Sequence, residues 1–297
     1  MAAAGETRMS KAMGAGWRKD PRATQRLVMD RLATVMSLAA TGILVLALVS
    51  ILWTLLWNGL AGLSLAALLH PMGPPGSNGG LANAILGSLI QTAVALIIAT
   101  PVGLGCGIYL SEFGSGSKFA MSVRFVSDVL LSAPSILIGL FVYLVLVAPF
   151  GHFSGLAGSV ALAILAVPII VRTTEDMLRL VPVAMREAGS ALGAAHWRVV
   201  LFLCLRSAAP GVLTGILLAL ARVSGETAPL LFTSLGNQNW SFSLNKPMAS
   251  LPIAIYQYAG ASYDDWVRLA WTGALLVTLG VLGINIIVRF GFRSKQS

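Results

Sequence analysis

Eighty consecutive positions, from Leu32 to Ser111, carry no lysine, arginine, aspartate or glutamate. A soluble domain cannot be built around such a stretch, because charged residues are needed where its surface meets water. Over the whole chain 57% of the residues are hydrophobic and only 10% are charged, whereas a soluble domain has about 25% charged residues. Intrinsic disorder is also excluded, because it requires low hydrophobicity. The composition therefore predicts an integral membrane protein.

Six runs of the sequence are long and apolar enough to cross about 30 Å of hydrocarbon as helices. They are residues 32–57, 81–110, 129–148, 155–171, 210–233 and 269–288. The predicted fold class is therefore all-α, a polytopic membrane protein with six transmembrane helices. No connecting loop is long enough to fold as a soluble domain. We expect one transmembrane domain at 32–290, a basic tail at 1–31 and a short tail at 291–297.

The basic residues alternate with these apolar runs. Seventeen of the 20 lysines and arginines lie before the first run, between the second and third, between the fourth and fifth, or after the sixth. The connections 58–80 and 149–154 contain none, and the segment 235–268 holds only Lys246 and Arg268. Because positively charged loops stay in the cytoplasm, both termini are predicted to be cytoplasmic. The formal net charge of +9 is thus mainly a signal of topology and does not indicate a nucleic-acid partner.

Sequence motifs of catalysis and metal binding are missing from the chain. The segment 114–118 has the composition of a phosphate-binding loop but not its spacing, and we interpret it as a hinge between helices. There is no His-Glu-x-x-His zinc motif and no Gly-x-Ser-x-Gly nucleophile elbow. The chain is therefore predicted to have no catalytic residues, no cofactor of its own and no metal site.

The predicted cytoplasmic segment 172–209 contains a short helix. Val181-Pro182 precedes Glu187-Ala188-Gly189-Ser190-Ala191-Leu192-Gly193, and proline at the start with glycine just past the end is typical of a helix. The pattern predicts a helix from about Pro182 to Leu192, which is too short to span a membrane. It either only closes the loop along the membrane face or docks on a partner protein. The spacing alone does not decide between these interpretations.

A second feature lies inside the fifth apolar run. Arg222 is about 18 Å along this run from Pro210 at 1.5 Å per residue, where an ionisable side chain costs about 2.5–3.5 kcal/mol to insert. The i,i+4 spacing of Arg222 and Glu226 predicts that they share one helix face, and Pro229 cannot donate to the carbonyl of Gly225. The two charges either form a neutral pair that fixes helix packing or belong to a transport path. We favour the path, because transporters build sites from broken helices with polar groups at depth.

Both features resemble motifs of a known family. Glu187-Ala188-Gly189-x-x-x-Gly193 is similar to the coupling motif of the permease subunits of ATP-binding-cassette (ABC) importers, although Gly189 stands where an alanine is usual. The stretch 225–233 is similar to the segment after the intramembrane arginine of the A-type permeases of the bacterial phosphate-specific transport system, which maps to Arg222. Further similarities are Pro101-Val102-Gly103, Tyr109-Leu110-Ser111-Glu112, the stretch 134–140 and Met248-Ala249-Ser250-Leu251-Pro252.

The resemblance implies the fold of a type I ABC importer permease and the function of a transmembrane subunit in an ATP-driven phosphate importer of the bacterial inner membrane. The implied substrate path consists of Arg222, Glu226 and Thr227. The implied ATPase contact consists of Glu187, Ala188, Gly189 and Gly193. The implied partners are a homologous sister permease, two cytosolic ATPase subunits that carry ATP and Mg²⁺, a periplasmic phosphate-binding protein, inorganic phosphate and the lipid bilayer.

Three alternatives stay open. The first is that the chain is the sister permease itself, which shares Gly-Glu-Thr. The second is that it is a permease for another oxyanion such as sulfate or molybdate. Both alternatives within the family lack the continuation at 228–233. Outside the family, the alternative is a channel or membrane scaffold that works without ATP. Co-purification of an ATPase would favour the importer.

Overall fold

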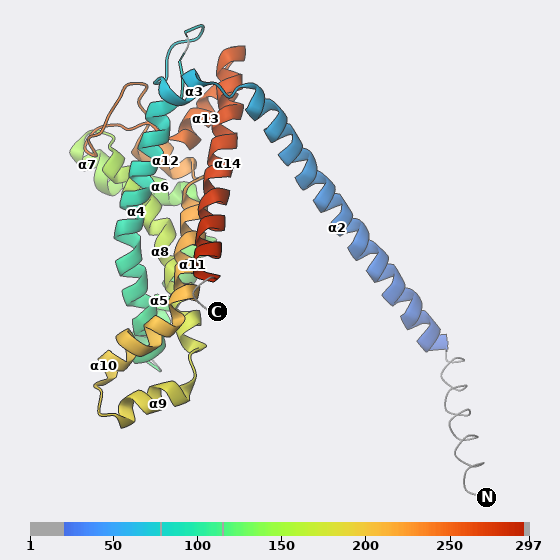
Figure 1. Cartoon of the computed structure of the whole chain (residues 1–297), viewed down its shortest axis with the longest axis vertical. Coiled ribbons are helices and arrows are strands. Elements are labelled where there is room, and N and C mark those ends of the chain that lie inside the picture. Colours follow the sequence, from blue (N-terminus) through green and yellow to red (C-terminus); the bar gives the residue numbers. More distant parts are fainter. Residues whose placement is uncertain (1–20, 78, 115, 294–297) are drawn as a thin grey trace, which may run out of the picture. The chain divides into compact units, whose positions relative to one another are not determined.

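The computed structural model describes residues 21–77, 79–114 and 116–293 (Figure 1). Within them the chain is helical, and the only β-type contact is an isolated bridge between Leu235 and Met248. The α-helices and the π-helical segments (η) are α2 (Pro21–Ala61), α3 (Leu65–Leu69), α4 (Ala82–Ile108), η1 (Tyr109–Phe113), α5 (Lys118–Ser132), α6 (Ser135–Val142), η2 (Tyr143–Val147), α7 (Ala148–Phe150), α8 (Gly155–Arg179), α9 (Val183–Ala191), α10 (His196–Arg198), η3 (Val199–Cys204), α11 (Leu205–Val223), α12 (Ala228–Thr233), α13 (Leu251–Ala259) and α14 (Asp264–Arg293). The predicted all-α class is confirmed.

The chain divides into two compact units, which we describe separately. The described part of the first unit is the portion of α2 from Pro21 to Leu55. Residues 21–31 of the predicted basic tail are thus helical, while residues 1–20 lie outside the described part of the chain. The second unit begins at Leu56 and contains the end of α2 and all the later helices. Within it, Gly59 of α2 lies directly against Leu275 of α14.

Five helical segments of the described chain are long and apolar enough to cross a membrane. They are Gln25–Ala61, Ala82–Phe113, Gly155–Arg179, His196–Val223 and Asp264–Ile286. The third apolar run, 129–148, does not form the straight helix that we predicted. It is divided between the end of α5 and the segment formed by α6, η2 and α7, and the chain bends by 107° between Lys118–Ser132 and Ser135–Phe150. Counting this bent pair as one crossing gives up to six spans.

Pro134 accounts for the bend between α5 and α6. A proline disfavours the helical conformation in the residue before it, and Ala133 is extended, with φ −68° and ψ 139°. The fifth run also differs from the prediction. Its helix begins at His196 and ends at Val223, so it lies further towards the N-terminus than 210–233. The segment 172–209 is therefore mostly helical and not a long loop.

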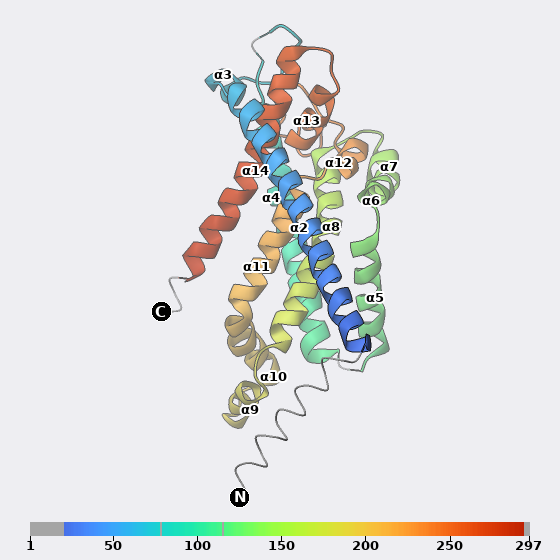
Figure 2. The ribbon, with the colours of Figure 1, turned by 90° about the vertical axis from the view of Figure 1, so that its right-hand side faces the viewer.

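Helix α8 forms the centre of the second unit, and 72% of its most apolar stretch is buried. It contacts α4 and α11 along their length and also touches α5, α6 and α12 (Figure 2). The face of α4 that meets α8 has small residues at a four-residue spacing, so that Gly103 lies against Ile170 and Gly107 against Thr174. Small residues let membrane helices approach closely. The glycines near the end of the second run therefore allow a close contact between α4 and α8.

The two ends of the second unit differ in charge. Helices α9 and α10 lie at one end, and α3 and α13 lie at the other (Figure 1). The basic residues of the α9 end lie in α9 itself and in the neighbouring parts of α5, α8, α10 and α11: Lys118, Arg124, Arg172, Arg179, Arg186, Arg198 and Arg206. At the opposite end the connection 234–263 and the start of α14 contain only Lys246 and Arg268.

Candidate functional site

The first candidate site lies where the fifth span is interrupted. Helix α11 ends at Val223 and α12 begins at Ala228. Pro229 has no N–H group with which to continue the helical bonding, and the amide of Glu226 donates instead to the carbonyl of Val223 at 3.3 Å. On the other side Pro229 lies against Gly139 of α6, so that α12 packs on α6. The weakening predicted at this point is a complete interruption.

Arg222 and Glu226 meet across this interruption. A guanidinium nitrogen of Arg222 lies 3.7 Å from a carboxylate oxygen of Glu226, which is longer than a hydrogen bond. The Arg222 side chain is 48% exposed and the Glu226 side chain 16% exposed. Our prediction that the two share one helix face was wrong, because Glu226 lies beyond the end of α11. Ser224 and Gly225 form the turn that joins the end of α11 to Glu226.

Thr227 completes this site. It is the N-cap residue of α12, but its side chain makes no capping hydrogen bond. Its carbonyl accepts the amide of Leu231 at 3.1 Å and so starts the short helix. The three residues predicted to form the substrate path therefore lie at one interruption of the span: Arg222 in the last turn of α11, and Glu226 and Thr227 between α11 and α12. Among the described residues no cluster of three or more histidine, cysteine, aspartate or glutamate side chains could hold a metal ion.

The second candidate site is α9, at the far end of the span from Arg222. The helix runs from Val183 to Ala191 with Pro182 and Leu192 as its caps, which agrees with the predicted bounds. Glu187 and Ala188 are exposed on its outer side. Gly193 follows the helix with φ +77°, a left-handed conformation in which glycine is the default residue. The motif therefore supplies both an outward surface and the turn that ends the helix.

Gly189 lies on the inner side of α9. A Cβ atom at this position would be 3.1 Å from Cγ2 of Val199 and 3.3 Å from Cδ2 of Leu203. Contacts of this length are tighter than ordinary van der Waals packing, so η3 would have to give way. The glycine that replaces the usual alanine therefore lets α9 approach η3 closely.

Arg186 and Glu112 form a partly buried ion pair that the sequence motifs did not indicate. Arg186 Nη2 lies 2.7 Å from Glu112 Oε1, and its Nε donates to Oε2 at 3.2 Å. Arg186 also donates to the carbonyls of Leu178 at 2.8 Å and Val181 at 2.5 Å. The hydrogen bond to Glu112, whose side chain is 4% exposed, raises the pKa of Arg186 above its ordinary value. The available sequence signal was an acidic residue directly after an eighty-residue stretch without charge.

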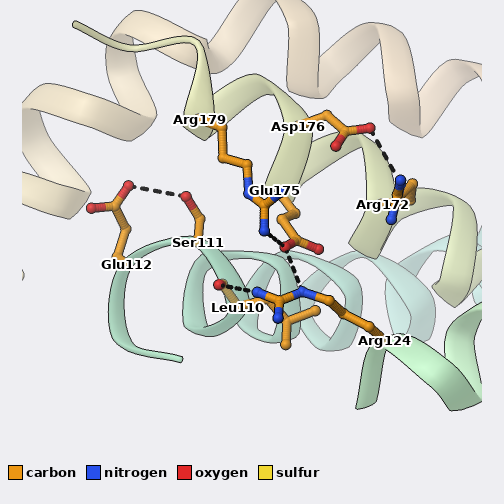
Figure 3. Close-up of polar contacts among 8 residues, drawn as sticks. All are labelled: Leu110, Ser111, Glu112, Arg124, Arg172, Glu175, Asp176 and Arg179. Carbon is orange, nitrogen blue, oxygen red and sulfur yellow. Dashed lines mark hydrogen bonds and ion pairs between the residues drawn. The ribbon is translucent and has the colours of Figure 1, made fainter. Parts of the chain in front are cut away.

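Glu175 is the centre of a second buried cluster (Figure 3). Its side chain is 2% exposed, and one carboxylate oxygen lies 2.8 Å from Arg124 Nε and 2.5 Å from Arg179 Nη2. Arg124 also donates to the carbonyl of Leu110 at 2.9 Å. The neighbouring pair of Arg172 and Asp176 is exposed and 3.4 Å apart. The sequence indicated only that these arginines lie on one side of the membrane.

Comparison with known protein families and proteins gives a consistent result. The family of binding-protein-dependent transport system inner membrane components matches residues 99–293. The chain is 52% identical over 246 residues to the phosphate transport system permease protein PstA of Pasteurella multocida, covering 83% of this chain and 88% of the relative. It is 50% identical over 268 residues to the protein of the same name from Yersinia pestis, covering 90% and 91%.

Solved structures show the same fold at lower sequence identity. An inward-facing structure of the MetNI methionine ABC transporter aligns with a TM-score of 0.62 and 21% identity, covering 72% of this chain and 95% of the other. A crystal structure of an amino acid ABC transporter with histidines aligns with a TM-score of 0.54 and 16% identity, covering 71% and 92%. The helical arrangement is thus that of ABC importer permeases.

Proposed function

We propose how this chain works from the premise that it belongs to the binding-protein-dependent transport system inner membrane components and, within them, to the phosphate transport permeases. It is a multi-pass integral membrane protein and the transmembrane permease of an ABC phosphate importer. Its task is then to move an anion through hydrocarbon only when a partner supplies energy. One observation carries the proposal, namely a half-exposed, loosely held arginine at the interruption of a membrane-spanning helix.

In this proposal the α9 end of the molecule faces the cytoplasm. The concentration of arginines and lysines at that end and their scarcity at the α13 end support this orientation. The bent pair α5–α6 serves as one crossing, which gives six crossings and two cytoplasmic termini. For a bacterial importer this membrane is the cytoplasmic (inner) membrane.

Arg222 compensates the charge of phosphate in the path. A phosphate ion that leaves water needs its charge matched, and the planar guanidinium offers a fork of donors to two of its oxygens. Because the nearest carboxylate oxygen of Glu226 is 3.7 Å away, the hydrogen bonds of Arg222 are not consumed by its neighbour. The hydroxyl of Thr227, which does not cap α12, supplies a further donor to the same ion.

Glu226 makes the binding of phosphate reversible. A permanently tight site would trap the ion, since conduction needs binding weak enough for release. Glu226 attracts Arg222 when the path is empty and competes with phosphate when it is occupied. The carboxylate is 16% exposed, so its attraction is screened less than that of a pair in free solvent.

The outer face of α9 is the surface that the ATPase contacts. Val183, Ala184, Glu187, Ala188 and Leu192 are exposed there, which leaves an apolar helix face with one carboxylate for a partner to hold. The partner is a cytosolic ATPase that carries ATP and Mg²⁺, present as two subunits. A homologous sister permease forms the other half of the path, and a periplasmic phosphate-binding protein delivers the substrate.

The experiment that tests this function uses the complex reconstituted in proteoliposomes with its permease and ATPase partners. We expect ATP hydrolysis that rises when the phosphate-loaded binding protein is added, together with phosphate uptake that sulfate does not inhibit. Uptake that continues without ATP would show a channel. Stimulation by sulfate as strong as by phosphate would show a permease for a different oxyanion.

A further inference from the structure

The two candidate sites lie at opposite ends of one span. The span His196–Val223 has 28 residues, which corresponds to roughly 40 Å of helix. The coupling helix α9 precedes its first residue, and Arg222 lies in its last turn. If α9 receives the energy and Arg222 binds the substrate, a movement of α9 has to reach helices that border the interruption.

Helix α4 is the element that connects the two regions. At the α9 end it continues directly into η1, which carries Glu112. Near the interruption it lines a cavity of about 470 Å³, whose walls include Ser88 and Thr92 of α4, Leu220 of α11 and Ser224. Ser224 is the first residue after α11. A displacement of α4 against α11 therefore changes the space at the end of α11, where the interruption begins.

Arg186 fastens α9 to η1. Its guanidinium reaches both oxygens of Glu112 and, in addition, the carbonyls of Leu178 and Val181, which precede α9. These four acceptors hold the side chain in one position. Since Glu112 is 4% exposed, water does not compete strongly for the pair. The contact is therefore a stiff connection between α9 and the end of α4.

The same π-helical segment is held from its other side by Arg124 of α5. Arg124 donates to the carbonyl of Leu110 in η1 and to the carboxylate of Glu175 in α8 (Figure 3). The Glu175 side chain is 2% exposed and also accepts a hydrogen bond from Arg179. The segment η1 thus joins α9 through Arg186 and joins α5 and α8 through Arg124.

We propose that Glu112 and Arg186 are positioning residues that transmit the displacement of α9 to α4, and that Arg124 and Glu175 pass it on to α5 and α8. This inference rests on the proposed function, because it assumes that an ATPase moves α9. Neither ion pair touches the substrate. Their task is to make the cytoplasmic ends of four helices move as one body. An apolar contact alone would permit sliding, whereas a bidentate ion pair fixes direction as well as distance.

The first test measures phosphate transported per ATP hydrolysed by the reconstituted complex. Glu112→Ala removes the acceptor, Glu112→Gln keeps its shape, and Arg186→Lys keeps the charge but loses the fork. Coupling between two sites is typically worth a factor of 5 to 150, so we expect the ratio to fall at least about fivefold in Glu112→Ala and less in the other two. ATP hydrolysis should continue, because the outer face of α9 is unchanged.

The matched control is Asp176→Asn, which removes a carboxylate from the exposed pair beside Glu175. We expect its ratio to equal that of the unmodified complex. The proposal is wrong if Glu112→Ala and Glu112→Gln both keep the normal ratio. It is also wrong if neither variant assembles with the ATPase, because the pair would then serve folding only.

A second measurement separates this inference from the proposed function. Spin labels at Ser190 of α9 and Gly105 of α4, with Cys106 and Cys204 replaced by alanine, report the distance between the two helices without any transport assay. We expect this distance to stay constant between the nucleotide-free and ATP-bound complex, and to change in Glu112→Ala. A distance that changes equally in both proteins would overturn the inference. Absence of phosphate-stimulated hydrolysis in the unmodified complex would instead overturn the proposed function.

Discussion

Arg222 and Glu226 lie 3.7 Å apart across the end of α11, near enough to attract each other and too far apart to share a hydrogen bond. Glu226 lies beyond the last residue of α11, so the two side chains are not carried by one continuous helix. The arginine is thus held electrostatically while its donors stay available to an anion. This arrangement differs from that of Glu175, whose oxygen is hydrogen-bonded to two arginines.

Replacing Arg222 should stop transport without disturbing assembly. Arg222→Gln removes the charge that compensates phosphate, and because the side chain is 48% exposed the fold should tolerate the change. We expect uptake by the proteoliposomes to be abolished. Arg222→Lys keeps the charge but loses the planar fork, so its uptake should be impaired but measurable. Normal uptake by Arg222→Gln, or failure of this variant to assemble, would favour a purely structural ion pair.

Glu226→Gln should have a smaller effect than the loss of the arginine. The variant removes the competitor for Arg222, so phosphate should bind more tightly and leave more slowly. We expect a lower maximal rate of uptake together with a lower phosphate concentration for half-maximal uptake. An unchanged profile would show that Glu226 does not take part in release.

The topology can be tested with reporters at loops of known charge. A label at Ser77, in the uncharged connection before α4, should be accessible only from outside, and a reporter fused after Ser297 should be cytoplasmic. The bent pair α5–α6 predicts that a label at Lys118 and one at His152 lie on opposite sides. A cytoplasmic position for Ser77 would contradict the orientation.

A bulky side chain on the outer face of α9 should uncouple ATP hydrolysis from phosphate uptake. Glu187 is exposed, so Glu187→Trp should fold and insert normally but disturb the surface offered to an ATPase. We expect less ATPase to co-purify, or hydrolysis without uptake. The control is Ser190→Trp, another exposed position of the same helix. Equal effects of both variants would mean that the helix tolerates no bulk anywhere and that Glu187 has no specific role.

Replacing Gly193 should destabilise the end of α9 because of the backbone conformation at this position. Its φ of +77° is unfavourable for other residues, and no neighbouring atom would crowd an added Cβ. Gly193→Ala should therefore destabilise the end of α9 by about 1 kcal/mol without any steric clash. Faster hydrogen exchange of the amides at 188–194 would detect this change. Unaltered exchange would show that the turn adapts.

Removing the buried carboxylate of Glu175 should destabilise the protein. Glu175→Gln leaves Arg124 and Arg179 without their anion, and a hydrogen bond to a charged group contributes about 1.5–3 kcal/mol. Asp176→Asn changes the adjacent, exposed carboxylate, where an ion pair contributes about 0–1 kcal/mol. Unfolding in detergent should separate the two variants clearly. Equal stability would show that water reaches Glu175.

Much of the architecture could be predicted from local sequence patterns. The charge-free stretch from Leu32 onwards requires lipid, and the distribution of arginines indicates an orientation. Pro182 and Gly193 delimited α9 to within one residue at each end, since helix caps depend on a few adjacent residues. The interruption near Pro229 could be located for the same reason, because the missing N–H group is a property of one residue.

Other features were decided by contacts between distant parts of the chain. Arg186 binds Glu112 across 74 positions, and Arg124 binds Glu175 across 51. A single sequence contains no signal that pairs such residues. Hydrophobic periodicity and helix caps report the environment of each segment, whereas the partner of a buried charge depends on which helices meet, and that is settled only when the chain packs.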